Sequence, residues 1–146
     1  MAQGFFAIRD HRDMLAKAER EFVRMRADLN TDTLFNFFVT EYHVIDYVKA
    51  SAIPVTIIDK MYADPDFKMC RFICNKGKHL ELTKEDKDAQ FFRGYSGAMN
   101  SAPINSTPLN GGTPDRFVVD GRNVDVFRLG QDMIVKWNEF FVTNGI

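Results

Sequence analysis

The chain contains few of the residues that cross-link or interrupt structure, and it lacks any long apolar run. Its 146 residues include 2 cysteines, 5 prolines and 1 tryptophan. No stretch approaches the roughly 18 apolar residues of a membrane-spanning helix, and the first residues lack the basic and apolar regions of a signal peptide. Cys70 and Cys74 are four residues apart on a predicted helix, a spacing that disfavours a disulfide. We therefore expect a cytoplasmic protein without membrane association.

An excess of charge of either sign is also missing. Lysine and arginine number 19 and aspartate and glutamate 20, so the net charge is −1 and any nucleic-acid binding requires a local patch. Apolar residues make up 45% of the chain and include 14 phenylalanines, enough for a sizeable aromatic core. These properties predict one domain over residues 1–146.

Hydrophobic periodicity predicts helices in the first half of the chain. Residues 9–29 have apolar side chains at spacings of three and four, and residues 32–50 are apolar almost all round, which is typical of a central helix. Asn30 or Thr31 can cap the second helix. The segment 55–62 after Pro54 is compatible with either a helix or a strand.

A third helix is predicted to begin at a strong start signal. Asp64 can act as its cap and Pro65 fits the first helical position, which predicts a helix over 65–76. Gly77 is expected to end this helix or fray it, although the helix can continue through His79.

The second half of the chain differs from the first in composition. Residues 94–114 are rich in glycine, serine, asparagine and proline and predict a long polar loop, after a possible strand in "QFFRGYSGAM". "RFVVDGRNVDVF" predicts a β-hairpin that turns at Asp120-Gly121, and residues 129–142 predict a last helix with Trp137 on its apolar stripe. The predicted fold class is mainly α (α+β): a helical bundle of four to five helices with a small antiparallel β-hairpin before the C-terminal helix.

One charged residue conflicts with the apolar second helix. Glu41 lies within about 20° of Leu34 on the helical wheel, near the middle of the most apolar face. A buried carboxylate needs a partner or a raised pKa. An ion pair with Arg71 or Lys78 would satisfy it if the second and third helices pack antiparallel.

The segment "CNKGKH", residues 74 to 79, places several phosphate-binding groups together. Arg71, Asn75 and His79 are four residues apart and share a helix face, with Lys78 beside them. A guanidinium, an amide, an ammonium and an imidazole can hold a phosphate, and His79 could also move a proton in metal-independent RNA cleavage.

A second polar group lies on the second helix. His43 and Asp46 have a spacing that lets both ligate one metal ion, but a third ligand would have to come from His79, Glu41 or His11, and nothing in the sequence fixes that geometry. We therefore assign no metal site and no cofactor, and we treat His43 and Asp46 as possible neighbours of the binding site.

"YHVIDYV" followed by "CRFICNKGKHLEL" resembles the HEPN superfamily of small helical bundles, and also uncharacterised bacterial or mobile-element proteins that carry a similar segment. The spacing from Asn75 to His79 matches the family motif, whereas Cys74 stands where the family has an arginine. Active members are ribonucleases that pair two histidine-bearing helices across a dimer interface. The resemblance implies that His79 would be the acid–base group and that Asn75 would orient it.

These observations predict a HEPN-like accessory protein, non-catalytic, that binds a nucleotide, RNA or a protein partner. Its binding residues would be Arg71, Asn75, Lys78, His43 and Asp46. One alternative is a metal-independent ribonuclease that uses His79. The other is a purely structural adaptor that forms a homodimer and contacts its partner through the loop 94–114.

Overall fold

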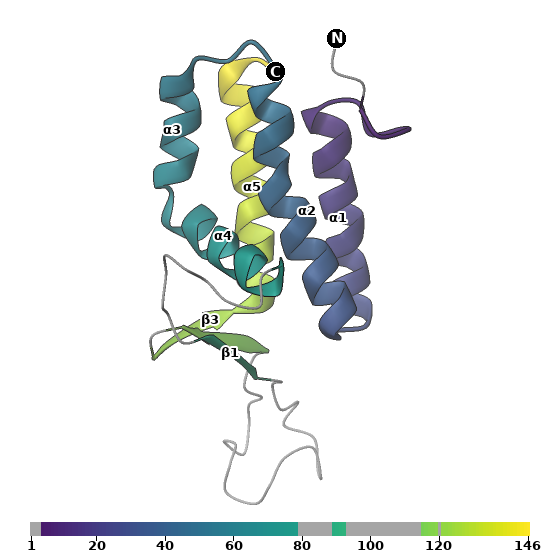
Figure 1. Cartoon of the computed structure of the whole chain (residues 1–146), viewed down its shortest axis with the longest axis vertical. Helices are drawn as coiled ribbons and strands as arrows, with labels where there is room; N and C mark the ends of the chain where they lie inside the picture. Colours follow the sequence, from purple (N-terminus) through teal and green to yellow (C-terminus); the bar gives the residue numbers. More distant parts are fainter. Residues whose placement is uncertain (1–3, 79–88, 93–114, 120) are drawn as a thin grey trace, which may run out of the picture. The chain divides into compact units, whose positions relative to one another are not determined.

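A computed structural model describes residues 4–78, 89–92, 115–119 and 121–146. These residues form five α-helices and a three-stranded antiparallel sheet (Figure 1), which confirms the predicted mainly α fold with a hairpin before the last helix. The predicted loop 94–114 and His79 lie outside the described residues. Contacts group the chain into two compact units, Met1–Leu82 with Gly130–Ile146, and Thr83–Leu129, and each unit is described by itself. The assignment to one domain stays a prediction.

The first two helices form a hairpin in the helical unit (Figure 1). α1 spans His11–Ala27 and α2 spans Thr31–Lys49. Asp10 caps α1 by accepting a backbone N–H of its first turn. Asn30 caps α2 in a capping box, in which its side chain accepts from the Thr33 N–H and the Thr33 hydroxyl accepts from the Asn30 N–H. Local polar residues therefore set where both helices begin.

The next two helices are α3, Val55–Ala63, and α4, Pro65–Lys78. The segment of uncertain type after Pro54 is thus helical. Gly77 lies inside α4, one residue before Lys78, so the helix continues past the glycine to the last residue described in this segment, and whether it frays or ends there stays a prediction. A helix continues through an interior glycine at a modest free-energy cost when the following residues favour it, as Lys78 does here.

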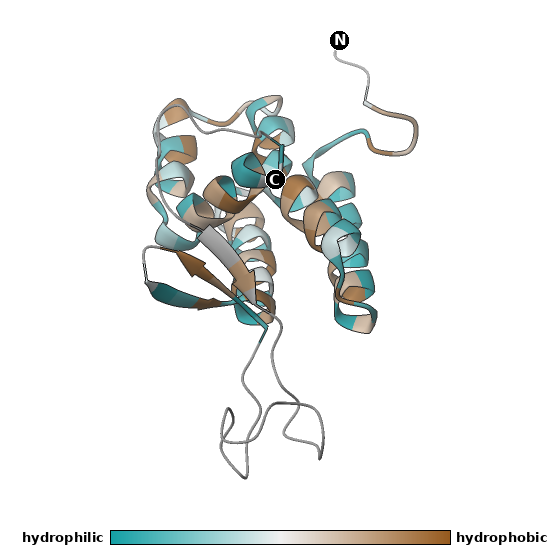
Figure 2. Cartoon of the chain, turned by 60° about the horizontal axis from the view of Figure 1, so that its bottom comes forward, coloured by the Kyte–Doolittle hydropathy of each residue, from teal (hydrophilic) through white to brown (hydrophobic). Residues whose placement is uncertain are grey.

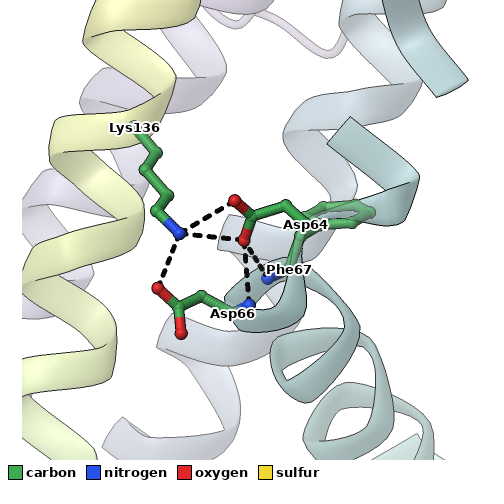
Figure 3. Close-up of polar contacts among 4 residues, drawn as sticks. All are labelled: Asp64, Asp66, Phe67 and Lys136. Atoms are coloured by element: carbon green, nitrogen blue, oxygen red, sulfur yellow. Dashed lines mark hydrogen bonds and ion pairs between the residues drawn. The ribbon is translucent and has the colours of Figure 1, made fainter. Parts of the chain in front are cut away.

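An ion cluster fixes the start of α4 against the last helix, α5, which spans Val126–Asn144. Asp64 accepts hydrogen bonds from the backbone N–H groups of Asp66 and Phe67 at 2.8 and 3.1 Å. The Lys136 ammonium donates to both carboxylates, at 2.8 Å to Asp64 and 2.7 Å to Asp66 (Figure 3). Asp64 therefore caps α4, as predicted, and also connects it to α5.

The core of the helical unit contains the apolar face of each helix. In Figure 2 every helix carries both hydrophilic and hydrophobic segments, as expected for elements with one buried face. Phe67 joins three of these helices, with ring centroids 5.4 Å from Tyr42 and 5.8 Å from Trp137. The fully buried large side chains of the helical unit are Trp137, Phe37, Phe38, Phe67, Met25, Ile45, Met133, Glu41, Val44, Val48 and Cys70.

The second unit contains the sheet, in the order β1-β2-β3. β2, Arg116–Val119, and β3, Arg122–Asp125, form the predicted hairpin, and Gly121 adopts the φ of +76° that its turn requires. β1, Ala89–Phe92, adds the third strand with Phe91 opposite Phe117. The strand expected in "QFFRGYSGAM" thus pairs with the hairpin through its first residues.

Candidate functional site

The structure brings together two of the predicted binding residues from different helices. The Lys78 ammonium nitrogen on α4 lies 3.2 Å from Nε2 of His43 on α2. Both side chains reach solvent at the surface where the two helices pack. The two residues are 35 positions apart in the sequence, and their contact places them in the same candidate site.

The second ring nitrogen of His43 determines how this contact works. Nδ1 lies 2.6 Å from the backbone carbonyl oxygen of Val39. A carbonyl oxygen only accepts hydrogen bonds, so Nδ1 carries a proton and donates. In the neutral ring Nε2 then has a lone pair, which accepts one of the three ammonium protons of Lys78. The ammonium group keeps two further protons for other acceptors.

Arg71 adds a second cation to the same surface. Its positive charge acts on the hydroxyl group of Tyr42, the neighbour of His43 on α2: burial raises the pKa of Tyr42, and the charge of Arg71 opposes this rise. Asn75 lies one turn beyond Arg71 on α4 and is partly exposed. The α2–α4 face, defined by His43, Arg71, Asn75 and Lys78, therefore carries two cations, an amide and an imidazole.

Asp46 lies at the edge of this face and opposes its charge. Its carboxylate pairs with Lys49 on its own helix at 3.7 Å. It also acts electrostatically on Tyr42 and on Cys74, so it is near both helices of the site. The structure therefore places Asp46 beside the α2–α4 face as a negative charge. His79 lies outside the described residues, and its assignment stays a prediction.

The buried acid anticipated on α2 has a partner other than the one expected. Glu41 is 0% exposed and accepts a hydrogen bond from the indole N–H of Trp137 at 3.0 Å. The thiol of Cys70 faces the same carboxyl group. Within the described residues Arg71 and Lys78 make no ion pair with Glu41, so the expected salt bridge is wrong: both cations project to the surface, while Glu41 faces the core.

Burial dominates the chemistry of Glu41. It raises the pKa of the carboxyl group to about 7, although hydrogen bonds from Trp137 and Cys70 act in the opposite direction. Oε2 has no hydrogen-bond partner in the described structure. The sequence predicts Trp137 only as a core residue, yet its N–H needs a buried acceptor, and that requirement is the one signal that could have linked it to Glu41.

The two cysteines are free and buried on α4. Burial raises the pKa of Cys74 to about 11 and raises that of Cys70 well above its ordinary value. Neither thiol is therefore a nucleophile at neutral pH. Within the described ranges, no three acidic, histidine or cysteine side chains are placed to hold a metal ion.

Comparison of the chain with family models, with curated proteins and with solved structures finds no match. Among the described helices, none combines the length and apolar character needed to cross a membrane.

Proposed function

We propose that this chain is a HEPN-like, non-catalytic binding protein that holds a phosphate-bearing ligand, a nucleotide or RNA, on the α2–α4 face. In this proposal it works in the cytoplasm as an accessory protein of a bacterium or a mobile element. The observation that carries the proposal is the 3.2 Å contact between His43 and Lys78, because it joins two predicted binding residues from separate helices.

The donors of this face suit an oxyanion. Lys78 uses one ammonium proton on His43 and has two more for phosphate oxygens. Arg71 offers a planar fork that matches two phosphate oxygens, and Asn75 offers a neutral amide between the two cations. An anion that accepts from Lys78 and Arg71 together would bridge α4 at positions about two turns apart, a span that fits a nucleotide polyphosphate or an RNA backbone better than a single small ion.

Cys74 favours binding over cleavage. It occupies the position where the resemblance predicts an arginine, and it is a buried thiol whose pKa is raised to about 11. A neutral thiol supplies no positive charge to stabilise the developing charge of a cleaved phosphodiester. At this position the chain therefore lacks the charge that the family's arginine would supply, while the α2–α4 face keeps donors that can bind a phosphate.

The test is a titration of the full chain with a labelled single-stranded RNA and, separately, with ATP, at low ionic strength. Lys78→Ala should weaken binding by about tenfold, since it removes a charged donor. Lys76→Ala is the matched control, because the same charge in the same turn of α4 lies on another face. The proposed site would be contradicted if neither variant lost affinity, or if both lost the same amount.

The same titration separates the alternatives. Cleavage of the RNA in the presence of EDTA, abolished by His79→Ala, would establish the ribonuclease and overturn a purely binding role. Absence of binding to both ligands would leave the adaptor, whose contact would depend on residues 94–114.

A further inference from the structure

The outer face of α1 has a charge pattern that is symmetric about one small residue. Arg12 and Asp13 precede Ala16 by four and three positions, and Glu19 and Arg20 follow it by three and four. Read in either direction from Ala16, the order is acid and then base. Such a pattern is self-complementary when a helix packs against an antiparallel copy of itself.

The helix geometry places these charges on two flanks. At about 100° per residue, Arg12 and Glu19 lie on one side of Ala16, and Asp13 and Arg20 lie on the other, all within about 60° of it. Each flank thus carries one acid and one base, seven residues apart. Consider a two-fold axis that passes beside Ala16 and is perpendicular to the helix. It brings the flank with Arg12 and Glu19 against the same flank of the second copy, and the two helices run in opposite directions.

We infer that this chain forms a symmetric homodimer in which the α1 helices of two copies pack antiparallel and cross at Ala16. In this arrangement Arg12 of each copy meets Glu19 of the other, and Asp13 of each copy meets Arg20 of the other. The inference goes beyond the proposed function and involves no residue of the α2–α4 face.

The charges of this α1 face have no ion-pair partners of their own. None of Arg12, Asp13, Glu19 and Arg20 makes an ion pair with another described residue. The neighbouring charges on α1 differ in this respect, since Glu21 pairs with Lys17 at 3.0 Å and with Arg24 at 2.7 Å. Three of these side chains do make hydrogen bonds within the chain: Arg12 donates to the backbone oxygen of Ile146 at 2.6 Å, Asp13 accepts from the Arg9 N–H at 3.0 Å, and Glu19 accepts from Asn138 at 3.5 Å. The charges without an ion-pair partner therefore coincide with the face that is symmetric about Ala16.

Space and apolar surface for a second helix lie on the same face. Arg12, Ala16 and Glu19 line a groove of about 520 Å³ together with Phe141 and Val142 of α5. Val142 is 83% exposed, and a shallower hollow of about 470 Å³ continues along α1 from Ala16 to Val23, which is 66% exposed. Ala16 at the crossing point permits close approach, and the two valines gain cover from the copy.

The antiparallel arrangement is favoured over a parallel one by the helix dipoles, whose opposite ends then lie together. The exposed ion pairs make the interface sensitive to salt, and the small apolar area makes it weaker than an obligate dimer. The partner is a second copy of this chain, because the charges of the α1 face are complementary to the same charges on an antiparallel copy.

Sedimentation velocity of the full chain over a concentration series tests the inference. The wild type should form a dimer that dissociates as the salt concentration rises. Glu19→Arg and Arg12→Glu should each raise the dissociation constant by about tenfold or more, since like charges then meet across the axis. Arg20→Glu should do the same, and its side chain makes no described hydrogen bond or ion pair whose loss could explain the effect.

An equimolar mixture of Glu19→Arg and Arg12→Glu gives the sharpest result. In an antiparallel heterodimer the arginine introduced at position 19 of one chain faces the glutamate introduced at position 12 of the other. The unchanged Arg12 of the first chain faces the unchanged Glu19 of the second. The mixture should therefore regain the wild-type dimer affinity as a heterodimer, whereas a parallel pair would not.

Lys68→Glu on α4 is the control for a single charge reversal, and circular dichroism confirms that each variant is folded. A monomeric wild type, a dimer indifferent to the α1 reversals, or a mixture that stays dissociated would overturn the inference.

Discussion

Trp137 donates its indole N–H to the carboxyl group of Glu41 over 3.0 Å and so connects the centre of α5 to the centre of α2. Both residues are fully buried, and they are 96 positions apart in the sequence. The bond gives each polar group of the pair one partner inside an aromatic core. It also places a carboxyl group that titrates near neutral pH at the point where three helices meet, with Cys70 of α4 on its other side.

Glu41→Gln should remove a pH dependence of stability. Burial raises the pKa of Glu41 to about 7 in the folded chain, against an ordinary value of 4.5, so its contribution is fully present below about pH 4.5 and is lost as the pH rises through 7. The shift corresponds to about 3 kcal/mol in the free energy of unfolding. Glutamine keeps the acceptor for Trp137 and carries no charge, so urea denaturation at pH 8.5 should show a more stable variant and at pH 4.5 a similar one.

The single tryptophan reports the same titration. Wild-type fluorescence should change with a midpoint near pH 7, and Glu41→Gln should give a flat profile over that range. Glu41→Leu is the contrasting variant: it leaves the indole N–H unpaired in the core, so it should be less stable than Glu41→Gln at all pH values. A wild-type profile without a transition near pH 7 would show that Glu41 does not ionise there.

Much of the helical unit can be predicted from short-range signals. The periodicity of α1 and the Asp64-Pro65 start of α4 act over three or four residues, and they predict the bounds of both elements to within about two residues. α3 is ambiguous in the sequence because it has 9 residues and no side-chain cap. The contacts Glu41–Trp137 and Lys136–Asp64 cannot be derived in this way, since a helical wheel shows which side chain is buried and not which distant residue it meets.

Lys136→Met should destabilise the chain and shift its acid transition. Asp64 is partly buried, which raises its pKa, but hydrogen bonds from Lys136 and from the Phe67 N–H outweigh this effect and lower it. A lowered pKa adds stability that is present above the ordinary value and is lost as the pH falls. Without Lys136, two carboxylates face each other (Figure 3), so we expect a loss of about 1–2 kcal/mol at pH 7 and acid unfolding at a higher pH.

The control for this substitution is Lys60→Met, because Lys60 lines one surface hollow together with Asp64 and Lys136 but makes no ion pair with the described residues. It should leave both the urea midpoint and the acid transition unchanged. Equal effects of the two substitutions would mean that the loss of stability comes from the change in net charge and not from the ion cluster of Lys136 with Asp64 and Asp66.

Two interior helix glycines should respond in opposite directions to alanine. A Cβ at Gly130 would lie 2.7 Å from a ring carbon of Phe22 and 2.9 Å from one of Phe37, both in the packed core. Gly130→Ala should therefore destabilise the chain by about 1–3 kcal/mol. A Cβ at Gly77 meets only the ring of the exposed Phe35 at 3.1 Å, so Gly77→Ala should stabilise α4 by about 0.5–1 kcal/mol. Thermal denaturation of both variants checks this pair, and two changes of the same sign would contradict the packing around Gly130.

Both cysteines should resist modification while the chain is folded. Cys70 and Cys74 are 0% and 1% exposed, and burial raises the pKa of both thiols. A thiol reagent should label neither in native buffer at pH 8 and both in denaturant. Val55→Cys supplies the positive control, because this position on α3 is 70% exposed and should react at once. Rapid labelling of Cys74 in the native chain would show that α4 opens at the candidate site.

Asp46→Asn should strengthen binding of the phosphate-bearing ligand. Asp46 is a negative charge at the edge of the α2–α4 face, and its pairing with Lys49 at 3.7 Å leaves it exposed enough to repel an incoming anion. Asparagine has the same size and removes that repulsion, so the affinity for RNA or ATP should rise by about two- to fivefold at low salt and converge on the wild-type value as salt is added. Asp59→Asn, on α3, neutralises an exposed carboxylate elsewhere and should leave the affinity unchanged. If both substitutions strengthened binding equally, the ligand would be responding to the net charge of the chain, and this result would contradict the α2–α4 face as the binding site.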